Sequence, residues 1–390
     1  MPTTLKDEAA IVGIGQTEYS KNSGRSELQL AAEAVRNALE DAGLKPSDVD
    51  GMNTFTLDTS DEIEVARAVG IGDLTFFNRI PHGGGAAVSI VQHAAMAVAT
   101  GMAEVVVCYR ALNGRSGQRY SSGVGEGVVT SDLIHWSWYM PYGLMTPASW
   151  VAMCTMRYMH EYGCTGLDLA QVAGSTRKHA VNNPAAFFYG KPLTIEEHQS
   201  SRWIVEPLRL FDCCQETDGG AAVVVTTPER ARDLKQPPAL IRSAAQAAGA
   251  DQESMTSFYR PSITCLPEMD LVAKQVYEIS GLGPDDIDAA IIYDAFTPIV
   301  LWQLESFGFC KRGEAKDFIK DGNLEVGGRL PSNTHGGQLS EAYIHGVNGV
   351  VEGVRLIRGT SVNQPEKADH VLVTAGVGVP TSAMILGKLN

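Results

Sequence analysis

Two patterns of apolar and polar residues alternate along this chain, one typical of buried strands and one typical of helices. Short segments that are almost wholly apolar, at 9–14 (AAIVGI) and 104–109 (EVVVCY), predict strands buried on both faces. Residues 28–42 carry apolar side chains at helical spacing and stop before Gly43, a residue type common at helix ends. Strands alternating with helices predict an α/β fold with a largely parallel sheet, covered on both faces.

The same patterns predict the other elements of the first 236 residues. They are strands at 51–56, 74–78, 202–210 and 221–226, and helices at 61–69, 86–100, 147–162 and 168–182. Between about 113 and 200, Gly, Ser and aromatic residues dominate the connections (RSGQRYSSGVGEG and HWSWYMPYGLM). Long irregular segments are usually binding loops, so this stretch predicts a loop domain inserted in the first half.

The second half of the chain repeats the first. Residues 34–50 (AVRNALEDAGLKPSDVD) and 272–288 (VAKQVYEISGLGPDDID) match at one offset, each ahead of a strand. The shared positions are Gly43 and Gly281, Leu44 and Leu282, Pro46 and Pro284, Asp48 and Asp286, and Asp50 and Asp288. We predict two copies of one α/β half, 1–236 and 237–390, with a site where their loops meet.

Composition narrows the class of protein. The net charge of −14 and the lack of a basic cluster argue against a nucleic-acid surface. No apolar run reaches the roughly 20 residues of a membrane helix, and the N-terminus has no signal-peptide pattern. The seven cysteines are scattered without a CxxC pair, and the nine histidines form no metal-binding motif. We expect a soluble cytoplasmic enzyme with reduced thiols and no metal.

One stretch, 333–359 (NTHGGQLSEAYIHGVNGVVEGVRLIRG), joins a glycine-broken polar loop to an amphipathic run. Ser340 is predicted to cap the helix, with Glu341 in its first turn. Tyr343 and His345 would then lie near a helix N-terminus, where backbone N–H groups stabilise developing negative charge. The alternative is a surface loop followed by an ordinary helix.

The duplicated halves, the inserted loop domain and the ending TAGVGVPTS resemble the thiolase superfamily over nearly the whole chain. The nearest branch is the thiolase domain of sterol carrier protein X, with its bacterial lipid-transfer-protein relatives. The resemblance implies a five-layered αβαβα thiolase fold that is usually dimeric and handles acyl-CoA thioesters.

The four catalytic loops of that family all differ here. The turn that opens with the nucleophilic cysteine reads HGGG at 82–85, and the loop that reads N-E-A-F or H-D-x-F in relatives is YDAF at 293–296. The G-H-P loop is AYI at 342–344, and the final cysteine falls at Thr374 or Ala375. Both thiolase cysteines are therefore missing, and acyl transfer through a covalent acyl-enzyme is not expected.

A fold that stabilises the enolate of a CoA thioester can also break a carbon–carbon bond without a thiol. The steroid side-chain-cleaving aldolases of bacterial sterol catabolism lack the cysteines in this way, and this sequence resembles them. The resemblance implies retro-aldol cleavage of a 17-hydroxy steroid C20-carboxyl-CoA to a 17-ketosteroid and propionyl-CoA. Neither a metal nor a separate cofactor is expected, because the thioester itself acidifies the α-carbon.

The candidate catalytic residues follow from these loops. Tyr343 and Tyr293 are expected to transfer protons, although each has a packed aromatic ring as its alternative. His335 is expected to polarise the thioester or a water, while Asp294 either orients a tyrosine or, as we favour, caps the next helix. His82 is either a catalytic base or a residue that only fills space. His345 is a weak catalytic candidate and is expected to be structural. The glycines expected to bind substrate or CoA are Gly83, Gly84, Gly85, Gly336, Gly376 and Gly378.

Two further groups of residues are weaker candidates for ligand binding. An aromatic group suits a flat apolar steroid, a protein surface or a packed cap; it comprises Trp136, Trp138, Tyr139, Tyr142 and Trp150. A scattered basic group suits CoA phosphates or simple solvation; it comprises Arg115, Arg119, Arg177, Lys178 and Arg202.

The resemblance also implies partners: a homodimer that binds a small OB-fold, zinc-ribbon protein of the DUF type, often fused to an enoyl-CoA hydratase. Two other functions stay open. One is an acetyl-CoA acetyltransferase-like thiolase that recruits another cysteine, and the other is a catalytically inactive scaffold for a partner enzyme.

Overall fold

The computed structural model describes residues 5–56, 60–117, 119, 137–250, 252–253, 257–376, 378 and 381–389. Within these residues, nine strands form one mixed sheet in the order β3-β2-β4-β7-β1-β8-β11-β10-β9. The strands are β1 (Ala10–Gln16), β2 (Gly51–Phe55), β3 (Phe76–Ile80), β4 (Val105–Asn113), β7 (Asp218–Thr226), β8 (Ala239–Ala247), β9 (Ala289–Ile291), β10 (His370–Ala375) and β11 (Thr381–Lys388).

The helices fall into three groups. Those around the sheet are α1 (Glu27–Ala42), α2 (Glu62–Val69), α3 (Ser89–Ala99), α8 (Pro228–Ala231), α9 (Pro267–Ser280) and α12 (Val347–Arg358). Those of the inserted region are α5 (Pro147–Tyr162), α6 (Gly166–Asn182) and α7 (Ile195–Ser200), with the short hairpin β5 (Trp203–Val205) and β6 (Leu208–Arg209). Helix α10 (Thr297–Ser306) packs against α6, and α11 (Ala315–Phe318) packs against α10.

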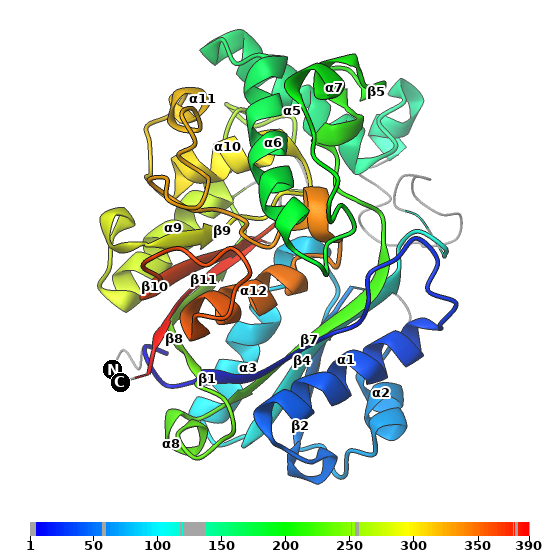
Figure 1. Cartoon of the computed structure of the whole chain (residues 1–390), viewed down its shortest axis with the longest axis vertical. Coiled ribbons are helices and arrows are strands. Elements are labelled where there is room, and N and C mark those ends of the chain that lie inside the picture. The colour runs from blue at the N-terminus through cyan, green and yellow to red at the C-terminus, as the bar shows by residue number, and fades with distance from the viewer. Residues whose placement is uncertain are drawn as a thin grey trace.

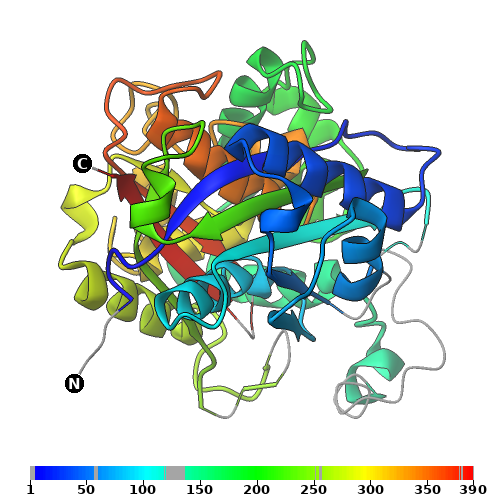
Figure 2. The ribbon, with the colours of Figure 1, turned by 90° about the horizontal axis from the view of Figure 1, so that it is seen from below.

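The sheet bends into two layers with helices between them (Figure 1). β1 and β8 pair at only two positions, which joins the halves at one edge. The buried helix α3 packs on β2, β4 and β7 and also on β8 and β11, and α12 likewise contacts strands of both halves. Helices α1 and α2 cover the outside of one layer and α9 the outside of the other, so the order is αβαβα, as Figure 2 shows from below.

The predicted repeat appears in the hydrogen bonds of both halves. Gly43 and Gly281 each end a helix in the left-handed region, both with φ of 75°. The Asp50 carboxylate accepts from the backbone N–H of Glu104 at the start of β4, and Asp288 accepts from that of His370 at the start of β10. The strand pattern repeats too, since β2 and β9 run parallel to β4 and β10, and these run antiparallel to β7 and β11.

Three expectations about elements were wrong or incomplete. The sheet is mixed, because β7 and β11 return antiparallel to their neighbours after each parallel unit. Residues 202–210 form a separate hairpin and not a strand of the main sheet. Ser340 does not cap a helix, since it lies in a single π-turn, Gly337–Glu341, and α12 begins only at Val347. Its Oγ instead accepts from Nε of Arg177 at 3.0 Å.

The division of the chain into two halves at residue 236 stays a prediction.

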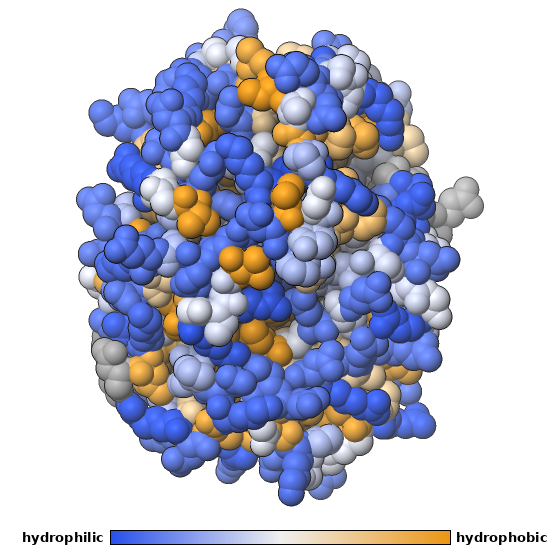
Figure 3. All heavy atoms as spheres, in the orientation of Figure 1, coloured by the Kyte–Doolittle hydropathy of each residue, from blue (hydrophilic) through white to orange (hydrophobic). Residues whose placement is uncertain are grey.

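Among the described residues, no helix is both long and apolar enough to cross a membrane. Figure 3 shows one face of the molecule, on which apolar side chains form small separate patches among hydrophilic ones. Monomeric proteins commonly carry apolar patches of that kind.

Candidate active site

Tyr293 is held by hydrogen bonds to both of its backbone polar groups. It follows β9 and is buried, with 4% of its surface exposed. Its N–H donates to Oγ1 of Thr374 at 2.9 Å, and its carbonyl accepts from Nε2 of Gln303 at 2.7 Å. Thr374 in turn donates to Oε1 of Gln303 at 2.5 Å. This closed set of bonds fixes where the Tyr293 ring leaves the backbone.

Tyr343 lies between the π-turn and α12, and its phenol meets that of Tyr293. The two phenol oxygens are 3.5 Å apart. The Tyr343 N–H donates to Oγ1 of Thr217 at 2.9 Å, so a residue just before β7 of the first half anchors the loop. The structure therefore brings together the two tyrosines that the sequence placed on separate loops. A phenol can both donate and accept a hydrogen bond, so each of the two can exchange a proton with a group bound beside it.

The glycine turn at 83–85 makes room for the Tyr293 phenol. A Cβ at Gly84 would lie 1.8 Å from the Tyr293 Oη, so no side chain fits there. Gly85 is tied to β11, because its carbonyl accepts from Oγ of Ser382 at 2.6 Å. The neighbouring His82 is half-buried, and a role for it as a base stays a prediction. The phenol occupies the space that a side chain at Gly84 would need, two residues after His82, which stands at the position of the thiolase nucleophile.

Asp294 was expected to cap the following helix, but it does not. The N-cap of α10 is Phe296, and no side chain caps it. The Asp294 carboxylate instead accepts from the backbone N–H of Gln338 at 2.7 Å and of Leu339 at 3.3 Å. Gly337 lies against this carboxylate with φ of +61°, and a Cβ there would be 2.0 Å from Oδ2. Burial raises the pKa of Asp294 to about 7, although the two N–H groups oppose that rise.

His335 and Glu341 form a buried polar layer under the loop. His335 Nε2 lies 3.9 Å from Oε2 of Glu341, and both side chains are 2% exposed or less. Glu341 accepts from Nδ2 of Asn348 at 2.8 Å and of Asn183 at 3.1 Å. Burial raises the pKa of Glu341 to about 8 and lowers the pKa of His335 to about 3. At neutral pH the imidazole is therefore neutral and Glu341 is mostly protonated.

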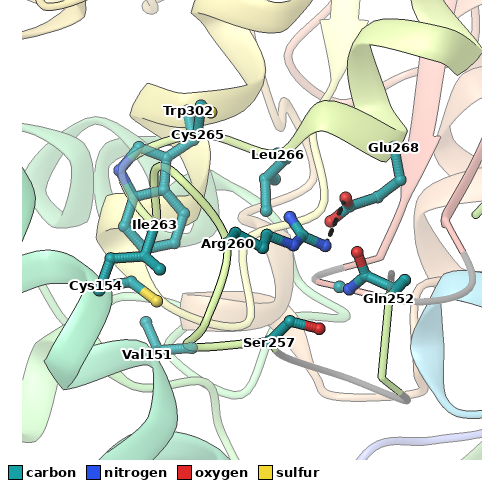
Figure 4. Close-up of a pocket in the computed structure, with 11 residues that line it drawn as sticks. Val151, Cys154, Gln252, Ser257, Arg260, Ile263, Cys265, Leu266, Glu268 and Trp302 are labelled. Carbon is teal, nitrogen blue, oxygen red and sulfur yellow. Dashed lines mark hydrogen bonds and ion pairs between the residues drawn. The ribbon is translucent and has the colours of Figure 1, made fainter. Parts of the chain in front are cut away.

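The loop after β10 carries two of the predicted glycines. Gly376 and Gly378 have φ of 116° and 73°, which a side chain would strain. Gly378 also borders a small pocket of about 30 Å³ between α5, α10 and α9 (Figure 4). In that view Arg260 pairs with Glu268 at 3.0 Å, and apolar side chains such as Ile263 line the other end. Pockets for drug-sized ligands usually measure about 300–1,000 Å³, so a steroid does not fit there in this conformation.

A larger, open groove of about 600 Å³ lies on the inserted region, beside α6 and α7. The Arg177 guanidinium stacks 3.5 Å from the Phe188 ring centre, and Lys191 and Arg202 also line the groove. Arg177 hydrogen-bonds Ser340 of the π-turn, which connects the groove to the loop of Tyr343. The groove combines positive charge with aromatic surface.

The other weak predictions had mixed outcomes. Trp150 is 2% exposed and donates to the Leu144 carbonyl at 2.7 Å, so it packs in the core and is no ligand platform. Trp138 and Tyr142 are 73% and 83% exposed, in a segment that projects from the body in Figure 2, while Trp136 lies outside the described residues. Lys178 is paired with Glu325.

All seven cysteines are free thiols, as predicted. Burial raises the pKa of Cys164 and of Cys310 to about 12, and that of Cys214 well above its usual value. Thiols of this kind are poor nucleophiles near neutral pH. Within the part of the chain that the structure describes, no group of three or more His, Cys, Asp or Glu side chains could hold a metal ion.

Comparison with known proteins shows the family to which the chain is similar. A family described as "Thiolase C-terminal domain-like" matches residues 248–388. A steroid side-chain-cleaving aldolase of Thermomonospora curvata is 65% identical over 99% of both chains. The 17-hydroxy-3-oxo-4-pregnene-20-carboxyl-CoA lyase of Mycobacterium tuberculosis is 62% identical over 98% of this chain and 100% of the other. A solved structure named Ltp2-ChsH2(DUF35) aldolase superposes with a TM-score of 0.95 at 65% identity, over 99% of both chains.

The fold is thus the thiolase fold. Within that superfamily, the chain belongs to the family of steroid side-chain-cleaving aldolases, which are lyases. The predicted fold class and family are confirmed.

Proposed function

We propose that this protein cleaves a 17-hydroxy-3-oxo steroid C20-carboxyl-CoA to a 17-ketosteroid and propionyl-CoA. The names of its close relatives support this substrate class. The observation that carries the proposal is the pair of phenols, 3.5 Å apart, beside a turn that carries no thiol and in which Gly84 leaves no space for a side chain. The site is equipped for proton transfer and not for acyl transfer.

In the proposed reaction, one of the two tyrosines acts as a phenolate and accepts the proton of the 17-hydroxyl group, while the other starts as a neutral phenol. The C17–C20 bond then breaks, C17 becomes a ketone, and the electron pair moves into the thioester as an enolate. The other phenol delivers a proton to C20, which gives propionyl-CoA. One proton leaves an oxygen and one is added to carbon, so the reaction is balanced and needs no oxidant. Delocalisation into the thioester removes the need for a Schiff base or a separate cofactor.

The enolate oxygen needs hydrogen-bond donors that are already in place. We propose that backbone N–H groups of Gly83–Gly85, Gly376 and Gly378 line the thioester. Gly336, whose own N–H donates to the Asn333 carbonyl at 2.8 Å, would instead allow the thioester to approach the backbone. His335 is neutral, because burial lowers its pKa to about 3, so it contributes a hydrogen bond and no charge. Asp294 contributes indirectly, since its carboxylate binds the N–H groups of the π-turn before Tyr343.

The groove beside α6 and α7 suits the nucleotide end of CoA. Lys191 and Arg202 are exposed there, and the Phe188 ring offers an aromatic face. Phosphates attract guanidinium and ammonium groups, and adenine stacks on aromatic rings. The steroid would then approach the phenols from another side.

The protein is proposed to act in the cytoplasm as a homodimer bound to an OB-fold, zinc-ribbon partner of the DUF35 type. The solved relative named for such a partner supports this assembly.

Incubation of the purified chain with the steroid acyl-CoA, with and without the partner, tests the function. Release of equal amounts of 17-ketosteroid and propionyl-CoA is expected. If neither product forms with or without the partner, the chain is a scaffold, whereas consumption of added free CoA to form a second acyl-CoA would indicate a thiolase.

A further inference from the structure

Arg110 is a buried arginine that reaches the site from the first half of the chain. It lies on β4, within the otherwise apolar run VVVCYRALN, and is 2% exposed. Its Nε donates to Nδ1 of His345 at 3.2 Å, and its Nη1 donates to the Ala111 carbonyl at 2.7 Å. Burying a charge in a strand is unfavourable, so an arginine at this place points to a specific task.

His345 connects Arg110 to Tyr343. The His345 ring is 2% exposed and perpendicular to the Tyr343 ring, with an interplanar angle of 84° and centroids 4.9 Å apart. Its backbone has φ of +51°, and the next residue, Gly346, has φ of +93°. A Cβ at Gly346 would lie 3.1 Å from the Tyr293 ring, so this strained loop is packed directly on the second phenol. Backbone strain of this kind concentrates at functional sites.

The hydrogen bond from Arg110 decides the protonation of His345. A guanidinium has only donors, so Nδ1 of His345 must be the acceptor and carries no proton. The ring is then neutral, with its single proton on Nε2. A neutral ring in one tautomer has a fixed hydrogen-bonding direction, and the guanidinium also fixes its plane.

We propose that Arg110 and His345 are positioning residues for the Tyr343 phenol. Arg110 holds His345 in the Nε2–H tautomer and in one plane, and the perpendicular ring contact keeps Tyr343 within reach of Tyr293. Neither residue touches the reacting atoms. The inference rests on the proposed retro-aldol function, in which the two phenols transfer protons.

The tautomer can be tested without any activity measurement. Long-range ¹H–¹⁵N NMR of histidine-labelled protein, with His345→Asn used to assign the signal, reports the protonation of each ring nitrogen. An unprotonated Nδ1 and a protonated Nε2 are expected near neutral pH. A protonated Nδ1, in either the neutral ring or the imidazolium, would overturn the inference even if wild-type protein cleaves the substrate.

A double-mutant cycle tests the action on Tyr343. Arg110→Met is expected to lower kcat about 30-fold with KM changed less than about threefold, but to lower it less than about threefold in the Tyr343→Phe background. Arg79→Met, which removes a guanidinium from β3 of the same sheet, is the control and should leave kcat near wild type. Equal losses in both backgrounds would mean a merely structural role and overturn the inference.

If Arg110→Met does not fold, His345→Asn replaces it in the double-mutant cycle with Tyr343→Phe, because His345→Asn leaves β4 unchanged. Absence of cleavage by wild-type protein would instead refute the proposed function, while the NMR result still decides the tautomer.

Discussion

The phenol of Tyr293 packs so closely on Gly84 that no side chain fits at position 84, because a Cβ there would lie 1.8 Å from the Tyr293 Oη. The turn that resembles the nucleophile turn of thiolases is thus incompatible with a side chain at this position. This packing lies two residues after His82, the residue at the position of the thiolase nucleophile. It joins a loop of the first half to a catalytic candidate of the second.

This relationship predicts the effect of adding one methyl group. Gly84→Ala should displace the Tyr293 phenol and lower kcat about 100-fold, since small misplacements of a reacting group are that costly. Gly72→Ala is the matched control, because this exposed glycine lies in the connection between α2 and β3 and nothing lies within 4 Å of a Cβ there. It should retain activity within about threefold. Steady-state release of the 17-ketosteroid measures both, and equal effects of the two variants would contradict the account.

Removing either phenol hydroxyl should stop proton transfer while keeping the ring. Tyr343→Phe and Tyr293→Phe are each expected to lower kcat by about 10²-fold or more. Tyr277→Phe is the matched control, because this partly buried phenol donates to the Phe307 carbonyl at 3.0 Å, away from the paired phenols. Retention of near wild-type turnover by both active-site variants would exclude the tyrosines as acid and base.

A buried carboxyl group predicts a pH dependence of stability. Burial raises the pKa of Glu341 from its usual 4.5 to about 8. Between these values the folded protein keeps a proton that the unfolded chain releases, so the free energy of unfolding falls as pH rises. Glu341→Gln removes this term, and its Tm relative to wild type should therefore increase from about pH 5 to about pH 8. The exposed Glu366→Gln should follow wild type, and a pH-independent difference for Glu341→Gln would refute this assignment.

The cysteines should be dispensable. Cys214 is the buried thiol whose backbone N–H donates to the carbonyl of Ala295, within the loop of Tyr293. Cys214→Ala is expected to retain kcat within about threefold, because no covalent acyl-enzyme forms in the proposed reaction. Trapping of an acylated cysteine during turnover, detected by mass spectrometry, would favour the thiolase alternative.

Charge reversal in the groove tests the proposed CoA contact. Arg202→Glu should raise KM for the acyl-CoA about tenfold with little change in kcat, and added salt should narrow the difference. Lys274→Glu on α9 is the control, since this exposed lysine lies outside the groove. An unchanged KM for Arg202→Glu would place the nucleotide elsewhere.

The sequence predicted those features that depend on local chemistry. The helix-ending turns at Gly43 and Gly281 match, as the sequence repeat predicted, and the repeated positions Asp50 and Asp288 make matching hydrogen bonds in the two halves. The loops of the two phenols were also located, because they stand at the positions of catalytic loops in the thiolases that the sequence resembles.

Features decided by distant residues were not predictable. Ser340 was expected to cap a helix, but Arg177 binds its hydroxyl group from the inserted region. Asp294 was expected to cap α10, but the N–H groups of the π-turn bind it instead. Arg110 was missed although a single charge inside an apolar strand was a usable signal, because its partner His345 lies 235 residues away.

The central claim is that two phenols, and no thiol, transfer the protons of carbon–carbon bond cleavage. A structure of the protein with both products bound, the 17-ketosteroid and propionyl-CoA, measures the distance from each phenol oxygen to the C17 oxygen and to the α-carbon of the thioester. The account predicts one phenol oxygen about 2.6–3.2 Å from the C17 oxygen and the other facing the α-carbon. Phenols turned away from both groups, with a cysteine thiol facing the thioester carbonyl, would contradict it.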